Sequence, residues 1–199
     1  MQANSGEAID SIHRFWFGEL DSHGRSAADR QILWFRKSDA TDQKIATQFG
    51  ALLKRARAAQ LDDWAESDRG LVALIVLLDQ FSRNIFRGSA EAFAADDKAL
   101  GLATDAIDAG RHHHLPVIHR VFLFLPLEHC EDIAVQERCV ALFEELGESG
   151  EEDLQNFTQY ALAHRDVIAR FGRFPHRNAL LGRESSAEEM EYLRTNGGF

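Results

Sequence analysis

The sequence is poor in cysteine and proline, with two cysteines and three prolines in 199 residues. Cys130 and Cys139 fall within one predicted helix, where side chains nine residues apart cannot meet to form a disulfide. We therefore expect both cysteines to be reduced thiols.

Long apolar runs are also missing. The most apolar segments, 71–78 and 121–127, are far shorter than the roughly 20 residues that a membrane-spanning helix needs. Residues 1–10 are polar and acidic and lack the pattern of a secretory signal. These absences predict a cytoplasmic protein with no membrane partner.

The chain has no surplus of basic residues, since its formal net charge is -10. General nucleic-acid binding needs a basic face that displaces counterions from phosphates, so we expect no nucleic-acid partner. HExxH, paired CxxC, phosphate-binding glycine loops and GxSxG are absent, and we therefore predict no metal and no cofactor. The length and the apolar content of 45% fit one globular domain over residues 1–199.

Helical periodicity dominates what is present. Apolar residues recur at steps of three and four, which predicts an all-α fold of about eight or nine helices. Residues 71–78 are apolar on all sides and should form a central helix buried between the others. The predicted helices cover residues 5–18, 27–37, 41–60, from 67 through the run 71–78, 90–109, 117–125, 126–146, 151–171 and a last one after 186.

Four local features set these boundaries. Thr41 and Ser67 are expected N-caps, and Ser186 with Glu189 forms a capping-box pattern. Proline fits the first turn of a helix and is costly inside one, so Pro126 is expected to start a new helix. Glycines 110, 147 and 172 are expected to end helices.

The first polar cluster follows the central apolar run. In a helix, Asp79, Arg83 and Arg87 would share one face, and Gln80 with Asn84 would form a second polar row. So abrupt a change from apolar to polar residues indicates a partly buried polar site. We take Asp79, Arg83, Asn84 and Arg87 as candidate ligand-binding residues.

The second cluster is an arginine-rich loop near the C-terminus. Arg173, His176, Arg177 and Asn178 surround Pro175, which stiffens the backbone that carries them. Guanidinium groups offer two parallel donors that suit phosphate or carboxylate groups. These four residues are candidate ligand-binding residues as well.

The third cluster places an imidazole beside carboxylates at Glu128, His129 and Glu131. Glu131 is added to the candidate ligand-binding residues, and His129 and His176 are the candidates for an acid or base. A metal would need three or four convergent ligands, and hydrogen-bonded structural histidines are the simpler interpretation. We therefore assign no metal ligand.

Four segments resemble one known family. Residues 15–20 read FWFGEL, 77–88 read LLDQFSRNIFRG, 125–132 read LPLEHCED, and 170–189 read RFGRFPHRNALLGRESSAEE. They closely resemble the bacterial family catalogued as domain of unknown function 924. The resemblance implies a tetratricopeptide-like fold of stacked antiparallel helical hairpins, and it brings no established activity.

Three functions remain open. The arginines could line a pocket of a binding module that holds an anionic small molecule or an acidic peptide. They could instead orient a phosphate or carboxylate in an enzyme whose acid or base is His129 or His176. Alternatively, they are structural and pair between helices with carboxylates, for which the candidates are Asp79, Asp96, Asp97, Glu128, Glu131 and Asp166.

Overall fold

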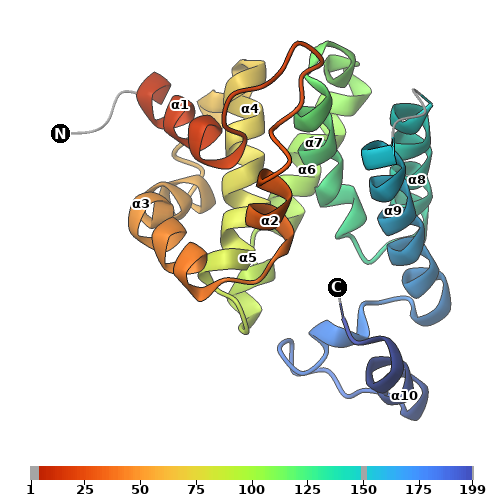
Figure 1. Cartoon of the computed structure of the whole chain (residues 1–199). Helices are drawn as coiled ribbons and strands as arrows, with labels where there is room; N and C mark the ends of the chain where they lie inside the picture. Colours follow the sequence, from red (N-terminus) through yellow and green to blue (C-terminus); the bar gives the residue numbers. More distant parts are fainter. Residues whose placement is uncertain (1–4, 149–151, 199) are drawn as a thin grey trace. The chain divides into compact units, whose positions relative to one another are not determined.

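The computed structural model describes residues 5–148 and 152–198 (Figure 1). Helices dominate these ranges, and the only β-type pairing in them is an isolated bridge between Leu20 and Ser26. The predicted all-α fold is therefore confirmed. In the same ranges no helix combines the length and the apolarity that crossing a membrane requires.

The chain divides into two compact units. Unit 1 holds the described residues up to Arg87 together with Ala92–Pro126, and unit 2 holds Gly88–Glu91 and the described residues from Leu127 onward. The prediction of one domain over the whole chain stays a prediction.

Unit 1 is built around one buried helix of three parts: α4 (Asp68–Ile75), a π-helical turn η2 (Val76–Phe81), and α5 (Ser82–Ile85). Every residue from 70 to 82 is buried. Three helices pack around it, namely α1 (Ser5–Trp16), α3 (Asp39–Arg57) and α6 (Asp96–Asp108) (Figure 1). The apolar run thus forms the predicted central helix.

Shorter elements complete unit 1. They are α2 (Arg30–Phe35), the 3-10 turns η1 (Asp62–Glu66), η3 (Ala90–Phe93) and η4 (Arg111–His114), and α7 (Val117–Glu128). Two of these, η3 and α7, cross the boundary between the units.

Aromatic rings join α1, α2 and α7. Trp16 lies 5.3 Å from Phe81 and 5.7 Å from Phe122, measured between ring centroids. Trp34 donates its indole N–H to the Trp16 carbonyl at 2.9 Å. Because no residue of α2 is buried, Trp34 and its neighbours hold that helix through such contacts. The tryptophans thus act as packing anchors here.

Unit 2 contains one long helical hairpin and an irregular C-terminal segment. Helices α8 (Ile133–Gly147) and α9 (Glu152–Phe171) pack side by side (Figure 1). The 3-10 turn η5 (Pro175–Arg177) and α10 (Ala187–Asn196) follow and contact each other. The expected start of α9 at Glu151 lies outside the described residues.

Most helix boundaries agree with the local sequence. Ser67 caps α4, Ser186 and Glu189 form the capping box of α10, and left-handed glycines follow α1, α6 and α9. The predicted helix over 90–109 is interrupted, because η3 ends at Phe93 and α6 begins at Asp96. Two assignments of a helix start were also wrong. The cap of α3 is Ser38, which accepts the Thr41 N–H at 3.2 Å, so Thr41 itself is already helical.

The second error concerns Pro126, which lies inside α7 and starts no helix. A proline near the end of a helix loses only one backbone hydrogen bond, and here it is buried among apolar neighbours. The next helix begins after Asp132, whose carboxylate accepts the N–H groups of Ala134 and Val135. Cys130 therefore lies between two helices while Cys139 lies in α8, and neither forms a disulfide, as expected.

Gly18 should be more costly to replace than a helical glycine. Its φ is +69°, and an added Cβ would lie 2.9 Å from a terminal nitrogen of Arg30. We expect Gly18→Ala to lower the free energy of unfolding by about 1–2 kcal/mol, because L-residues resist this conformation. Urea denaturation measures the change.

The matched control is Gly50→Ala in α3, where an added Cβ meets no atom within 4 Å. A helical glycine replaced by alanine should stabilise the protein by about 0.5–1 kcal/mol. Equal effects of the two substitutions would contradict the strain assigned to Gly18.

Candidate functional site

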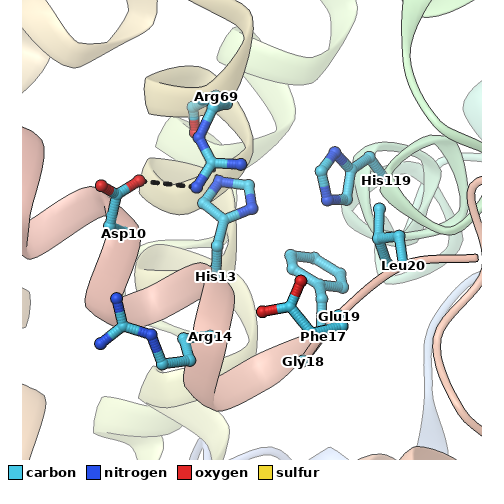
Figure 2. A pocket seen from close by; sticks show the side chains of 9 residues that line it. All are labelled: Asp10, His13, Arg14, Phe17, Gly18, Glu19, Leu20, Arg69 and His119. Atoms are coloured by element: carbon cyan, nitrogen blue, oxygen red, sulfur yellow. Dashed lines mark hydrogen bonds and ion pairs between the residues drawn. The ribbon is translucent and has the colours of Figure 1, made fainter.

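A pocket of about 420 Å³ opens in unit 1 between the C-terminal half of α1, the start of α4 and α7 (Figure 2). We call it the histidine pocket. Its lining residues are Asp10, His13, Arg14, Phe17, Gly18, Glu19, Leu20, Arg69 and His119. Its volume lies within the range of about 300–1,000 Å³ that is usual for small-molecule sites.

Two buried imidazoles form the inner part of this pocket. His13 and His119 are each 4% exposed, and their ring centroids are 4.8 Å apart. The Nε2 atom of His13 lies 2.9 Å from the Arg69 carbonyl, which only accepts hydrogen bonds. Nε2 therefore carries the proton, and in the neutral ring Nδ1 is a hydrogen-bond acceptor.

Neither ring has all of its nitrogens paired. Among the described residues, no hydrogen-bond partner reaches Nδ1 of His13 or Nε2 of His119. Buried polar atoms in folded proteins are usually paired, and an orphaned one commonly indicates a ligand, a water or a functional role. Both nitrogens belong to residues that line the pocket, and the pocket is therefore taken as the candidate binding site.

Burial keeps both imidazoles neutral. It lowers the pKa of His13, and it lowers the pKa of His119 from 6.5 to about 3, with a further contribution from neighbouring His13 and Arg69. At pH 7 the inner part of the pocket thus presents uncharged imidazoles.

Charged groups surround the opening of the pocket. Arg69 donates to the Asp10 carboxylate at 2.7 Å through one terminal nitrogen (Figure 2). Both side chains of that pair are more than half exposed. Arg14 and Glu19 are exposed, and neither makes an ion pair within the part of the chain that the structure describes.

The pocket combines one conspicuous motif with five residues that the sequence analysis did not assign to a site, namely Asp10, His13, Arg14, Arg69 and His119. FWFGEL supplies Phe17, Gly18, Glu19 and Leu20, because left-handed Gly18 ends α1 and turns the chain past the pocket. His13 and His119 were missed in the sequence. Each stands alone in an amphipathic helix, where a histidine normally predicts nothing more than packing.

The residues that the sequence did assign to a site are mostly ion-paired. Arg83 forms an ion pair with Asp79 at 2.9 Å and donates hydrogen bonds to both carboxylate oxygens of Asp96, at 2.8 and 2.9 Å. Gln80 also donates to Asp79, at 2.6 Å. Burial opposes the charge of Arg83, but the two carboxylates outweigh it and raise the Arg83 pKa.

Arg87 lies in the turn after α5, so it does not continue the helical face of Asp79 and Arg83 as expected. Its guanidinium donates to Asp42 at 2.6 and 3.0 Å, and Asn84 donates to the same carboxylate at 2.8 Å. This pairing raises the pKa of Arg87. Asp42 was not among the partners expected.

In unit 2, Glu131 organises the C-terminal segment. It accepts two hydrogen bonds from Arg183, at 2.5 and 2.9 Å, and one from the Phe174 N–H at 2.8 Å. Burial opposes its charge, yet these donors hold the Glu131 pKa below its usual value. Arg183 also donates to the side-chain oxygen of Asn178, which is fully buried.

The other residues of the arginine-rich loop have structural contacts as well. Arg173 donates to both oxygens of Glu189, at 2.7 and 2.9 Å, and this lowers the Glu189 pKa to about 2. The Arg177 guanidinium stacks 4.5 Å from the ring centroid of buried Phe174. His176 is half-buried, 5.6 Å from the same ring.

His129 also lies in unit 2, with its ring 6.3 Å from that of His164. His164 is buried, and its Nδ1 is 2.8 Å from the Tyr160 carbonyl and 3.4 Å from the Glu128 carboxylate. Burial lowers the His164 pKa to about 3. Within the described ranges, no three His, Cys, Asp or Glu side chains converge as metal ligands would.

The structure thus brings the predicted residues together in two sets. Unit 1 holds Asp79, Arg83, Asn84 and Arg87, and unit 2 holds Glu131, Arg173, His176, Arg177 and Asn178. Carboxylates occupy the guanidinium groups of Arg83, Arg87 and Arg173, as the structural alternative requires. That these residues bind a ligand stays a prediction.

Arg83 should be essential to the stability of unit 1. We expect Arg83→Met to lower the free energy of unfolding by about 3–5 kcal/mol, because it leaves the buried Asp79 carboxylate uncompensated. Adding Asp79→Asn should recover part of the loss. Chemical denaturation of the single and double variants measures both effects.

Arg87→Gln is the matched control, because its side chain is 38% exposed. Exposed pairs contribute less than about 1 kcal/mol, so its effect should be much smaller. A loss in Arg83→Met no larger than in Arg87→Gln would contradict the importance of the Asp79–Arg83–Asp96 contacts.

His119 should make the protein less stable in mild acid. Its pKa is about 3 in the folded chain and 6.5 ordinarily, so below about pH 6.5 only the unfolded chain binds this proton. Stability is therefore lost as the pH falls, by about 2 kcal/mol for this group between pH 7 and pH 5. In His119→Phe the free energy of unfolding should fall less over the same pH range, and the difference from the unsubstituted protein should be about 2 kcal/mol.

His114→Asn is the control, because this imidazole is exposed. The free energy of unfolding of His114→Asn should change with pH as that of the unsubstituted protein does. If His119→Phe retained the full pH dependence, burial of a neutral His119 would be refuted.

Comparisons with known proteins agree with this fold. The model of a family described as bacterial protein of unknown function (DUF924) matches residues 12–197. The solved structure of a protein of unknown function, ATU0120 from Agrobacterium tumefaciens, is 36% identical, with a TM-score of 0.84 over 97% of this chain and 100% of that one. A comparison with curated proteins gave no match. The chain therefore belongs to the DUF924 family of bacterial proteins of unknown function.

Proposed function

We propose that this protein is a binding module that holds a small molecule with an acidic group, a carboxylate or a phosphate, in the histidine pocket of unit 1. The observation that carries the proposal is the pair of buried imidazoles with unpartnered nitrogens beside two arginines. We favour this pocket over the arginine-lined site predicted from the sequence, because Arg83, Arg87 and Arg173 have carboxylate partners.

Arg14 and Arg69 are the groups that suit an acidic ligand. A guanidinium presents several N–H donors in a plane and pairs with carboxylate or phosphate through two parallel hydrogen bonds. Arg69 uses one terminal nitrogen for Asp10, which leaves its other donors for a ligand. Arg14 is exposed and makes no ion pair with any described residue, so its whole guanidinium is available.

The lowered histidine pKa values favour binding over acid–base catalysis. A general acid or base works best with a pKa near the pH of the reaction. The pKa of His119 is about 3, so this ring neither holds a proton to donate at pH 7 nor takes one up readily. A neutral imidazole still donates and accepts hydrogen bonds, which suits a role in orienting a ligand.

We also infer a cytoplasmic protein with tetratricopeptide-like stacking of its helical hairpins. The hairpin of α8 and α9 supports such stacking. Two cysteines that form no disulfide suit a reducing compartment. Burial raises the pKa of the Cys139 thiol well above its usual value, which makes it unreactive.

Arg14→Gln tests the proposal. The unsubstituted protein is titrated with a panel of carboxylates and phosphates, and thermal unfolding is followed because a ligand of the native state raises its stability. We expect at least one member of the panel to bind saturably. In Arg14→Gln the affinity for that ligand should fall at least about tenfold, which is 1.4 kcal/mol of binding free energy.

Arg36→Gln is the matched control, since Arg36 is an exposed arginine of unit 1 outside the pocket. It should bind the ligand as the unsubstituted protein does. Absence of any ligand in the panel, or equal losses in Arg14→Gln and Arg36→Gln, would overturn the proposed function.

A further inference from the structure

The opening of the histidine pocket carries negative as well as positive groups. Asp10 and Glu19 contribute two carboxylates, and Arg14 and Arg69 contribute two guanidinium groups. His13 and His119 add no charge at pH 7, because burial lowers the pKa of both. The formal charges of the pocket therefore cancel.

We infer that the ligand is a zwitterion of the α-amino acid type, with a carboxylate for the arginines and an ammonium group for Glu19. This inference rests on the proposed function and specifies its ligand class. A simple anion would gain from the two arginines but would meet two carboxylates at the same opening. An ammonium group on the same molecule turns that repulsion into attraction.

Glu19 is the group assigned to the ammonium. Its carboxylate is exposed and has no hydrogen bond or ion pair to any residue that the structure describes. Glu19 follows Gly18 directly. The left-handed turn at that glycine places Glu19 in the lining of the same pocket that α1 also lines (Figure 2). Arg14, from the last turn of α1, lines the same pocket with its own guanidinium unpaired among the described residues.

The inner part of the pocket suits the uncharged remainder of such a molecule. The rings of Phe17 and His119 lie 4.5 Å apart, line the pocket and are almost fully buried, so they close its inner side. The unpartnered nitrogens of His13 and His119 are buried within these inner rings. The arginines and Glu19 at the opening match the carboxylate and the ammonium group that an α-amino acid carries on one carbon. The side chain of the amino acid would then be directed inward.

Calorimetric titration of the full chain with matched sets of three probes tests the inference. Each set contains one protein amino acid, the same molecule without its amino group, and the same molecule without its carboxyl group. L-phenylalanine, 3-phenylpropionate and phenethylamine form one such set. We expect at least one amino acid to bind at least about tenfold more tightly than both of its partners.

Glu19→Gln should remove that preference. The amino acid should then bind no more tightly than its deaminated partner, whose own affinity should stay the same or rise. Glu66→Gln, at an exposed glutamate of unit 1 outside the pocket, is the control and should keep the preference.

The outcomes separate this inference from the proposed function. If deaminated acids bind as tightly as the amino acids, or if Glu19→Gln weakens both equally, the zwitterion is refuted while binding of an acidic group stands. If no amino acid and no carboxylic acid binds, both fail.

Discussion

A buried carboxylate is the constraint on which unit 1 depends. Asp79 is 1% exposed within the most apolar helix of the chain, and a charge in that position is tolerated only with a partner. Arg83, one turn later, supplies the partner and extends to Asp96 at the start of α6. Helix packing and charge neutralisation therefore require the same geometry. Unit 2 repeats the principle with Glu131 and Arg183, which hold the irregular segment after α9 in place.

Sequence reasoning succeeded where the physics is local. The run 71–78 could only be buried, and Ser67 and Ser186 cap helices through hydrogen bonds that span three residues. It failed where two local rules competed. Ser38 and Thr41 are both good caps three residues apart, and nothing in the sequence ranks them. Pro126 was expected to begin a helix, but tertiary burial outweighed the single hydrogen bond that the proline removes.

The candidate site could not be predicted for a different reason. The arginine clusters were conspicuous because guanidinium groups close together need explanation, yet their partners, such as Asp42 and Glu189, are distant in sequence. His13 and His119 carry no local pattern. What makes them notable is that folding buries two imidazoles, one from α1 and one from α7, against each other, and such a pairing exists only in three dimensions.

The π-helical turn at Val76–Phe81 makes the arrangement of unit 1 sensitive to helix length. A π-helical turn is the form in which an α-helix accommodates one extra residue, so a further residue inserted here would rotate α5 by about 100° relative to α4. Arg83 would then point away from α6, and Asp79 would lose the guanidinium that balances it. The central helix is therefore better able to accept a change of side chain than an added residue, so helix geometry as well as chemistry fixes the spacing of the motif at 77–88.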